Sequence, residues 1–344
     1  MRMVRKGVIK MIRVWFNHWF STSYWLIELM KKDLEEQIYV IGSNRQRDSV
    51  IQKVCDEWYE DSAAEGDAYI QDCLDFCIQH AVDVFVPRHK MVEIGKQRSR
   101  FEAIGVKVLL DAYETIHLLN DKAATYHFLE DEEQIPIPEY CVVNTLNQFQ
   151  MSYHDMRNRY ERLCMKFVCD EGGRSFRKII EEVDKLKRLR CYQGATITYD
   201  EVVRILESYE TFEDIIIMPY LSENEISVDC LNTAQGLIAI PRVKQAARHE
   251  QIVYDEAILS MTKKIIDKTN LQFPCNIQYR MEKGIPYLLE VNTRMSGGLQ
   301  LSCLASGVNI PNIALNKLLG KTVSWKLDKT QKVVSYIEMP QMIR

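Results

Sequence analysis

The chain has 344 residues, of which 47% are apolar and 27% are charged. This length is more than one small hydrophobic core needs, and it predicts two or three subdomains of an ordinary globular protein. The formal net charge of −4 gives no general attraction to nucleic acid or to an anionic membrane, so any anion site must be local. No uninterrupted apolar run follows the basic N-terminus, so we expect neither a signal peptide nor a membrane span.

Ten cysteines are scattered along the chain without a Cys-x-x-Cys pair. The nearest spacing, between Cys73 and Cys77, is one helical turn. This usage is typical of a reduced protein and not of a disulfide framework or a zinc site. We therefore expect a cytoplasmic location.

Strands and helices alternate over the N-terminal third. We predict strands at 12–16, 37–41, 82–86 and 106–110, and helices at 24–32, 49–58, 68–80 and within 111–129. Alternation of this kind predicts a parallel sheet of the doubly wound type, whose ligand crevice lies beyond the carboxyl ends of the strands. No Gly-x-Gly-x-x-Gly follows the first strand, so a dinucleotide-dependent enzyme is not expected.

The loops that follow these strands carry polar and cationic side chains, namely Asn17, His18, Ser21, Arg45, Arg47, Arg88 and His89. Arginine suits bidentate capture of a carboxylate or phosphate, so the loops predict a site for a small, doubly anionic acid. Polar residues are also ordinary in surface loops. The reading as merely solubilising arginines therefore stays open.

The middle of the chain contains a lysine-bearing helix around Lys122, two prolines within 135–138, a helix at 147–160 and a strand at 163–169 that carries Lys166. A turn with Gly172, Gly173, Arg174 and Ser175 follows, before a predicted helix at 176–189. A glycine pair lets backbone amides approach phosphate oxygens closely. Such a turn between a strand and a helix is more often only a turn, so both readings stand at this stage.

The last third begins with a helix at 199–209 and a buried strand at 215–221 that contains Pro219. We then predict a hairpin of strands 226–231 and 236–243, which presents Arg242 and Lys244 on one face, and a helix at 255–270. A second hairpin pairs 276–280 with 286–292. A helix at 302–319, broken near Pro311, and a strand at 332–339 close the chain.

Oxygen-bearing side chains gather on the second hairpin. Glu290 and Asn292 alternate with Leu289 and Val291, so they point to one face, and Gln278 on the partner strand can lie beside them. One carboxylate and two carboxamides suit Mg²⁺, which completes its octahedron with water and phosphate. The alternative is the solvated face of an ordinary surface strand.

The ordered set Gln278, Glu290-Val-Asn292-Thr-Arg294 and Ser296-Gly-Gly298 resembles the metal-binding end of the ATP-grasp superfamily, closest to the large-subunit branch of carbamoyl phosphate synthetase. The resemblance implies an ATP-grasp fold of mixed α/β and α+β class. It implies an N-terminal parallel α/β domain at 1–120, a lid subdomain at 121–212 and a C-terminal antiparallel-sheet core at 213–344. Gln278, Glu290 and Asn292 would hold Mg²⁺ or Mn²⁺ on ATP, and Arg294 would approach the transferred phosphoryl group.

The same resemblance assigns the nucleotide contacts. Lys122, Lys166 and the lid turn would hold the phosphates, Met218, Pro219, Tyr220 and Leu221 would pack against adenine, and Glu225 would accept the ribose hydroxyls. Arg242 would face the terminal phosphates, with Lys244 or Arg248 in reserve. This sequence departs from the family pattern at Phe167, where proline is usual, at the bulky Arg174, and at Met218, where an acidic residue is usual. The departures at Phe167 and Arg174 imply a stiffer loop or Arg174 as an extra phosphate ligand, and the departure at Met218 puts one adenine or sugar contact in doubt.

The activity implied is an ATP- and Mg²⁺-dependent carboxylate–amine or carboxylate–thiol ligase that acts through an acyl phosphate. Its expected partners are a small carboxylate and a nucleophile, without nucleic acid or membrane, and homodimer formation is left open. A single ATP-grasp unit without duplicated halves should not make carbamoyl phosphate alone. Two alternatives remain, a small-molecule kinase with the same ATP site and a nucleotide-binding module without turnover.

Overall fold

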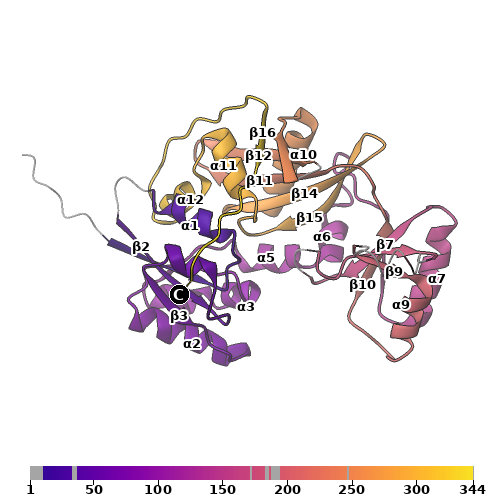
Figure 1. Ribbon diagram of the computed structural model, residues 1–344, viewed down its shortest axis with the longest axis horizontal. Helices are drawn as coiled ribbons and strands as arrows, with labels where there is room; N and C mark the ends of the chain where they lie inside the picture. The colour runs from indigo at the N-terminus through magenta and orange to yellow at the C-terminus, as the bar shows by residue number, and fades with distance from the viewer. Residues whose placement is uncertain are drawn as a thin grey trace, which may run out of the picture. The chain divides into compact units, whose positions relative to one another are not determined.

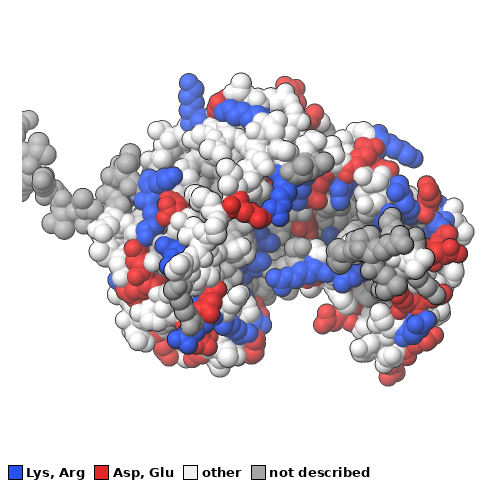
Figure 2. All heavy atoms as spheres, in the orientation of Figure 1, with Lys and Arg blue, Asp and Glu red and all other residues white. Residues whose placement is uncertain are grey.

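The computed structural model describes residues 11–32, 37–170, 173–182, 186, 194–245 and 248–343. The chain divides into two compact units. Unit 1 comprises Met1–His117, Ile226–Ile277 and Asn292–Arg344, and unit 2 comprises Leu118–Glu225 and Gln278–Val291. Acidic and basic side chains are interspersed over the face seen in Figure 2.

Unit 1 contains a parallel sheet with the strand order β3-β2-β1-β4-β5 (Figure 1). The strands are β1 (Met11–Asn17), β2 (Gln37–Asn44), β3 (Glu57–Glu60), β4 (Val84–Val86) and β5 (Lys107–Val108). Every neighbouring pair in this sheet runs parallel. The predicted N-terminal parallel sheet is therefore confirmed.

Both faces of the parallel sheet are buried, because successive side chains of a strand point to opposite faces. Val14 and Phe16 belong to one hydrophobic cluster together with helix α1 (Ser23–Met30), whereas Trp15 belongs to a second cluster together with α2 (Gly66–Gln79). The short helices α3 (Met91–Lys96) and α4 (Arg98–Ala103) follow β4, and α5 (Tyr113–Asn120) follows β5. The first cluster also takes in the helices of the chain's last third, so the core of unit 1 joins the two ends of the chain.

The predicted helix at 49–58 is wrong in its second half. A 3₁₀ turn, η1 (Val50–Val54), is followed by the edge strand β3, in which Trp58 pairs with Gly42 of β2. The local spacing of apolar residues in this segment favours a helix, but pairing with β2 decides its conformation. Local propensity is routinely overridden by such tertiary pairing.

Unit 2 contains a mixed sheet with the order β6-β10-β7-β8-β9. Its strands are β6 (Cys141–Val143), β7 (Leu163–Phe167), β8 (Arg177–Ile180), β9 (Thr196–Thr198) and β10 (Ile215–Pro219), and its helices include α6 (Lys122–Leu129), α7 (Leu146–Arg157) and α9 (Tyr199–Leu206). The helix predicted at 176–189 is wrong at its start, because β8 pairs antiparallel with β7 and parallel with β9. Much of the remainder of that prediction lies outside the described residues.

The third sheet has the order β15-β14-β11-β12-β13-β16. Its strands are β11 (Glu225–Thr233), β12 (Gly236–Lys244), β13 (His249–Ile252), β14 (Cys275–Glu282), β15 (Ile285–Asn292) and β16 (Lys332–Ser335), with helix α10 (Glu256–Thr269) before β14. The boundary between the two units passes through β14 and β15. The two predicted hairpins are confirmed as neighbouring strands of this sheet.

The predicted helix at 302–319 is two helices, α11 (Leu299–Ser306) and α12 (Ile310–Leu318). A break near Pro311 was predicted, and it lies at Gly307, whose φ of 73° ends α11 in the left-handed conformation. Pro311 lies in the first turn of α12, where its missing N–H has no helical partner to lose. Asn309 caps α12 by accepting the amide of Asn312.

Buried charges join the third sheet to α11 in unit 1. The side chain of Arg242 on β12 is only 2% exposed, and its Nε donates to Asp229 Oδ2 and to Ser302 Oγ, both at 2.9 Å. The other two guanidinium nitrogens donate to Glu250 Oε2 and to the hydroxyls of Ser227 and Ser296. Burial alone lowers the pKa of Arg242, but the carboxylates of Asp229 and Glu250 outweigh it and hold the pKa above its ordinary value.

We predict that Gly298→Ala lowers the free energy of unfolding by about 1–3 kcal/mol, because overpacking a filled site has costs of this order. A Cβ at Gly298 would lie 2.6 Å from both Cζ and Nη2 of Arg242, which the hydrogen bonds above hold in place. The matched control is Gly95→Ala in α3, where the nearest side-chain atom would be 3.5 Å away. Urea denaturation compares the two variants. Wild-type stability of Gly298→Ala would contradict this account of the loop.

Candidate functional site

Two lysines and one carboxylate meet inside unit 2. Lys122 opens α6, Lys166 lies on β7 and Glu290 lies on β15. Glu290 Oε2 is 3.9 Å from Lys122 Nζ and 3.8 Å from Lys166 Nζ, and the three side chains are between 7% and 14% exposed. The structure therefore brings together three residues that were predicted from the sequence as phosphate or metal ligands.

Local contacts hold this lysine cluster in place. The amine of Lys122 donates to the carbonyls of Asp170 at 2.5 Å and of Val168 at 3.3 Å. Burial lowers the pKa of Lys166, an effect that the charge of Glu290 opposes in part. Tyr126 on α6 donates its hydroxyl to the carbonyl of Leu289 at 2.7 Å, which fixes α6 against β15 beside the cluster. Lys122, Lys166 and Glu290 carry a formal charge of +1 together, so the cluster suits a further anion.

The lid turn stays close to the end of β7. Ser175 accepts the amide of Phe167 at 3.0 Å, and its own amide donates to Asp170 at 2.8 Å. Gly173 has a φ of 69°, a conformation that favours glycine. Arg174 is exposed, and Gly172 lies outside the described residues. The phosphate contacts assigned to this turn stay a prediction.

The predicted adenine-binding stretch is largely buried. Met218 and Pro219 end β10, and the amide of Tyr220 donates to the carbonyl of Arg162 at 2.9 Å. This amide is therefore already used within unit 2. Glu225 Oε2 lies 3.9 Å from Arg280 Nη2, so the ribose acceptor of the prediction has a cationic neighbour. The roles of Met218 to Leu221 and of Glu225 stay predictions.

The proposed metal ligands fall on both sides of the unit boundary. Gln278 and Glu290 belong to unit 2, whereas Asn292 and Arg294 belong to unit 1. Glu290 and Asn292 are two residues apart on β15, so the strand directs them to one face. Among the described residues, no group of three or more His, Cys, Asp or Glu side chains could hold a metal. The donor set predicted here is of another kind, one carboxylate with two carboxamides, and it fits Mg²⁺ that keeps water and phosphate as further ligands.

A second group of residues lies at the carboxyl end of the parallel sheet in unit 1. The guanidinium carbons of Arg88 and Arg294 are each 5.9 Å from the centre of the Phe20 ring. The Arg88 amide donates to Asn17 Oδ1 at 2.7 Å, which anchors the loop after β4 to the end of β1. One aromatic ring thus places an arginine from the N-terminal loops near the arginine that follows β15. The sequence predicted both arginines and missed Phe20, for which no sequence signal was available.

Other polar residues of the loops at the carboxyl end of the parallel sheet bond to neighbouring residues of unit 1. Arg45 donates to the carbonyls of Ser62 and Ala64 and pairs with Glu65, so it holds its own loop. His18 Nε2 lies 2.6 Å from Asp61 Oδ2, and its ring is 4.6 Å from that of His89 between centroids. Burial is the main cause that lowers the pKa of His89. Asp61 was missed because it follows an edge strand that the sequence pattern assigned to a helix.

Arg242 is placed in the buried network of unit 1 described above, with all three guanidinium nitrogens bonded. Contact with a terminal phosphate stays a prediction, and it would require Arg242 to release one of these partners. Lys244 and Arg248, the reserve residues, line a cavity elsewhere in unit 1.

No helix among the described residues is both long enough and apolar enough to cross a membrane.

Comparison with known proteins supports the resemblance seen in the sequence. The family model of an ATP-grasp in the biosynthetic pathway with Ter operon matches residues 211–342. The carbamoyl phosphate synthase large chain of Thermoanaerobacter sp. (strain X514) is 23% identical over 236 residues, which are 63% of this chain and 20% of that protein. The chain thus spans about a fifth of the length of that curated relative.

Solved structures show the same fold. The MgADP, ADP and bicarbonate complex of the biotin carboxylase domain of Hydrogenobacter thermophilus 2-oxoglutarate carboxylase superposes with a TM-score of 0.66 and 16% identity, covering 93% of this chain and 73% of that one. An ADP complex of N5-carboxyaminoimidazole ribonucleotide synthetase superposes with a TM-score of 0.69 and 11% identity, covering 96% and 82%. The chain therefore has the ATP-grasp fold, and it is similar in sequence to the carbamoyl phosphate synthase large chains.

Proposed function

We propose that this protein is an ATP- and Mg²⁺-dependent ligase that joins a small carboxylate to an amine. The observation that carries the proposal is the lysine cluster of unit 2, in which Lys122 and Lys166 flank Glu290 at 3.9 and 3.8 Å. Two buried cations near one carboxylate form a site for a polyphosphate with its divalent ion. Phosphoryl transfer needs little more from a protein than such positioning and charge neutralisation.

The lysines have separate tasks in this proposal. Lys122 is anchored by backbone carbonyls, so it offers a fixed charge, whereas Lys166 on β7 lies beside the lid turn that begins after Asp170. Gln278, Glu290 and Asn292 would hold Mg²⁺, which neutralises phosphate charge when it is bound. The lid turn at Gly173 to Ser175 would lie over the phosphates and exclude water.

In this proposal, residues of unit 1 bind the carboxylic acid substrate. Arg88 and Arg294, both within 5.9 Å of the Phe20 ring centre, would bind a small acid that carries two anionic groups. A carboxylate oxygen of the acid attacks the γ-phosphorus, the bond to ADP breaks, and an acyl phosphate forms. The amine nitrogen then bonds to the acyl carbon, inorganic phosphate leaves, and the amine releases a proton.

A thiol in place of the amine would follow the same steps. A kinase would stop at the phosphorylated product and release no inorganic phosphate, so the measurement of free phosphate separates it from the ligase.

We predict that Glu290→Gln abolishes ATP turnover and leaves the fold intact. The substitution removes the only formal negative charge among the proposed metal ligands while it keeps the shape of the side chain. Glu207→Gln at the end of α9, an exposed carboxylate, is the control. ADP release is measured with ATP, Mg²⁺ and a panel of acids and amines, and circular dichroism monitors the fold. Turnover at the wild-type rate would remove Glu290 from the site.

Nucleotide affinity should fall as the pH rises through the lowered pKa of Lys166, because the neutral amine no longer balances phosphate charge. An exposed lysine would lose its proton only near pH 10.5. Lys166→Arg should keep its affinity over that range, since arginine stays protonated. Titration calorimetry with ADP between about pH 7 and pH 10 tests this, with Lys263→Arg on α10 as control. Parallel pH profiles for wild type and Lys166→Arg would contradict the assignment.

The same pKa direction has a consequence for stability without nucleotide. The folded state binds fewer protons than the unfolded state between the lowered pKa of Lys166 and its ordinary value, so the free energy of unfolding should rise with pH in that window. Lys166→Met should remove this rise, as measured by denaturation at several pH values.

Arg88→Ala should raise the KM for the acid at least tenfold and leave the KM for ATP nearly unchanged, because Arg88 lies in unit 1 on the acid side. Arg100→Ala on α4, where the arginine donates to Gln71, is the matched control. Steady-state kinetics with each substrate varied in turn separates the two constants. A normal KM for the acid in Arg88→Ala, or a preference for acids with a neutral tail, would contradict the proposal that Arg88 binds a doubly anionic acid.

A further inference from the structure

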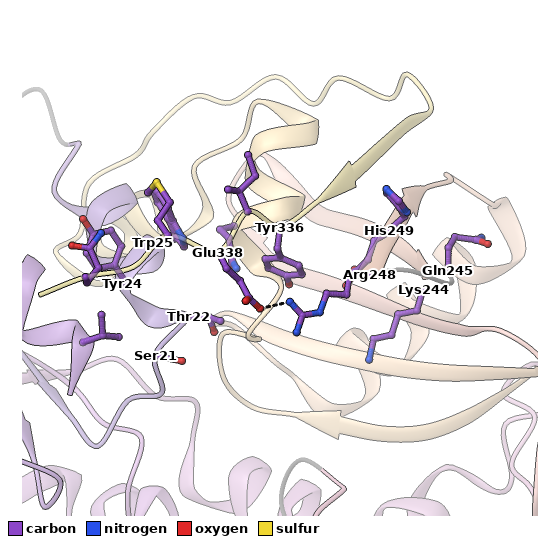
Figure 3. Close-up of a pocket in the computed structure, with 16 residues that line it drawn as sticks. Ser21, Thr22, Tyr24, Trp25, Lys244, Gln245, Arg248, His249, Tyr336 and Glu338 are labelled. Carbon is purple, nitrogen blue, oxygen red and sulfur yellow. Dashed lines mark hydrogen bonds and ion pairs between the residues drawn. The ribbon is translucent and has the colours of Figure 1, made fainter. Parts of the chain in front are cut away.

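Unit 1 contains a cavity of about 610 Å³, a volume in the range of small-molecule sites. Figure 3 shows its walls: Tyr24 and Trp25 come from α1, Lys244 from the end of β12, Arg248 from the position before β13, and Tyr336 and Glu338 from the segment after β16. The residues that line the cavity belong to unit 1, whereas the lysine cluster belongs to unit 2. None of its wall residues has a part in the nucleotide contacts proposed above except the reserve residues Lys244 and Arg248.

The wall residue Gln300, near the start of α11, points to a ligand. Its side-chain nitrogen and oxygen are both buried, and neither forms a hydrogen bond with any described residue. A buried polar group left without a partner costs about 1–3 kcal/mol. An extended peptide ligand offers the N–H and the C=O of one residue on the same side, and this donor and acceptor would satisfy both atoms at once.

The other walls define the rest of the ligand. Tyr24, Trp25 and Tyr336 present aromatic surface, which suits an apolar or aromatic body. Lys244 and Arg248 supply the cationic side, which suits a carboxylate. The two acidic wall residues are both engaged, Glu250 with Arg242 and Glu338 with Arg248.

The cavity also borders the loop that follows β15. The hydroxyl of Tyr336 donates to the carbonyl of Gly297 at 3.5 Å. On the other side of this loop, a Cβ at Gly297 would lie 3.3 Å from Oγ1 of Thr22, another wall residue. The cavity wall is thus continuous with the Arg294 to Gly298 loop, at which the acyl phosphate is proposed to form.

We propose that this cavity binds the second substrate, an amine of dipeptide type that carries a carboxylate, a peptide group and an apolar side chain. The ligand's role as acceptor rests on the proposed ligase function, whereas its binding does not. The carboxylate faces Lys244 and Arg248, the N–H and carbonyl of the first residue of the dipeptide pair with Gln300, and the side chain lies against the aromatic wall.

Titration calorimetry with glycyl-L-tyrosine and glycyl-L-tyrosinamide tests the proposal, with and without a non-hydrolysable ATP analogue. The dipeptide should bind wild type, and its amide, which lacks the carboxylate, should bind at least tenfold more weakly. Gln300→Leu should weaken dipeptide binding at least tenfold while its Tm stays at or above the wild-type value, because an unsatisfied buried amide is removed. Gln79→Leu, an exposed glutamine at the end of α2, is the control.

Arg248→Gln provides a second variant on a side chain that is 70% exposed, so it tests the cationic wall without a risk to folding. The proposal is overturned if the dipeptide and its amide bind wild type equally well, or if Gln300→Leu and Arg248→Gln both bind the dipeptide as wild type does. It is also overturned if wild type does not bind the dipeptide either with or without the ATP analogue. Glu290→Gln distinguishes this failure from failure of the ligase function, since it should lose ATP turnover and still bind the dipeptide as wild type does.

Discussion

The buried ion network around Arg242 is the interaction on which the architecture of unit 1 depends. It joins β11, β12, β13 and the start of α11 through one guanidinium, two carboxylates and several hydroxyls. Removing one partner of such a network costs about 3–5 kcal/mol, because the other charge stays buried without compensation. The path of the loop from Arg294 to Gly298 follows from it, since only a residue without a Cβ fits against the guanidinium.

The two charged clusters differ in the sign of their excess formal charge, and this difference separates structure from function. Asp229 and Glu250 more than balance the charge of Arg242, and Asn276 and Ser296 satisfy the second oxygen of Asp229. In unit 2, Lys122 and Lys166 both face Glu290, and burial lowers the pKa of Lys166. The network around Arg242 stabilises the fold, whereas a pair of buried lysines in excess of their carboxylate is ready to receive an anion.

The loops at the carboxyl end of the parallel sheet connect these elements to substrate binding. Phe20 and Thr22 lie in one short loop, and they contact Arg88, Arg294 and the Gly297 backbone within unit 1. The same loop enters α1, whose Tyr24 and Trp25 line the cavity. A single connection after β1 therefore shapes both the proposed acid site and the proposed acceptor site.

The sequence by itself determined the strands whose residues alternate in polarity, the parallel N-terminal sheet and the order of Gln278, Glu290, Asn292 and Arg294, because all of these are patterns of local spacing. Tertiary structure decided what depends on a distant partner. Trp58 and Ile179 lie in strands because β2 and β7 pair with their segments, although each segment alone resembles a helix. Contacts between residues far apart in the chain also decide that Arg242 is buried, that Phe20 lies near two arginines, and that the amide of Gln300 has no hydrogen-bond partner among the described residues. No local pattern encodes such contacts.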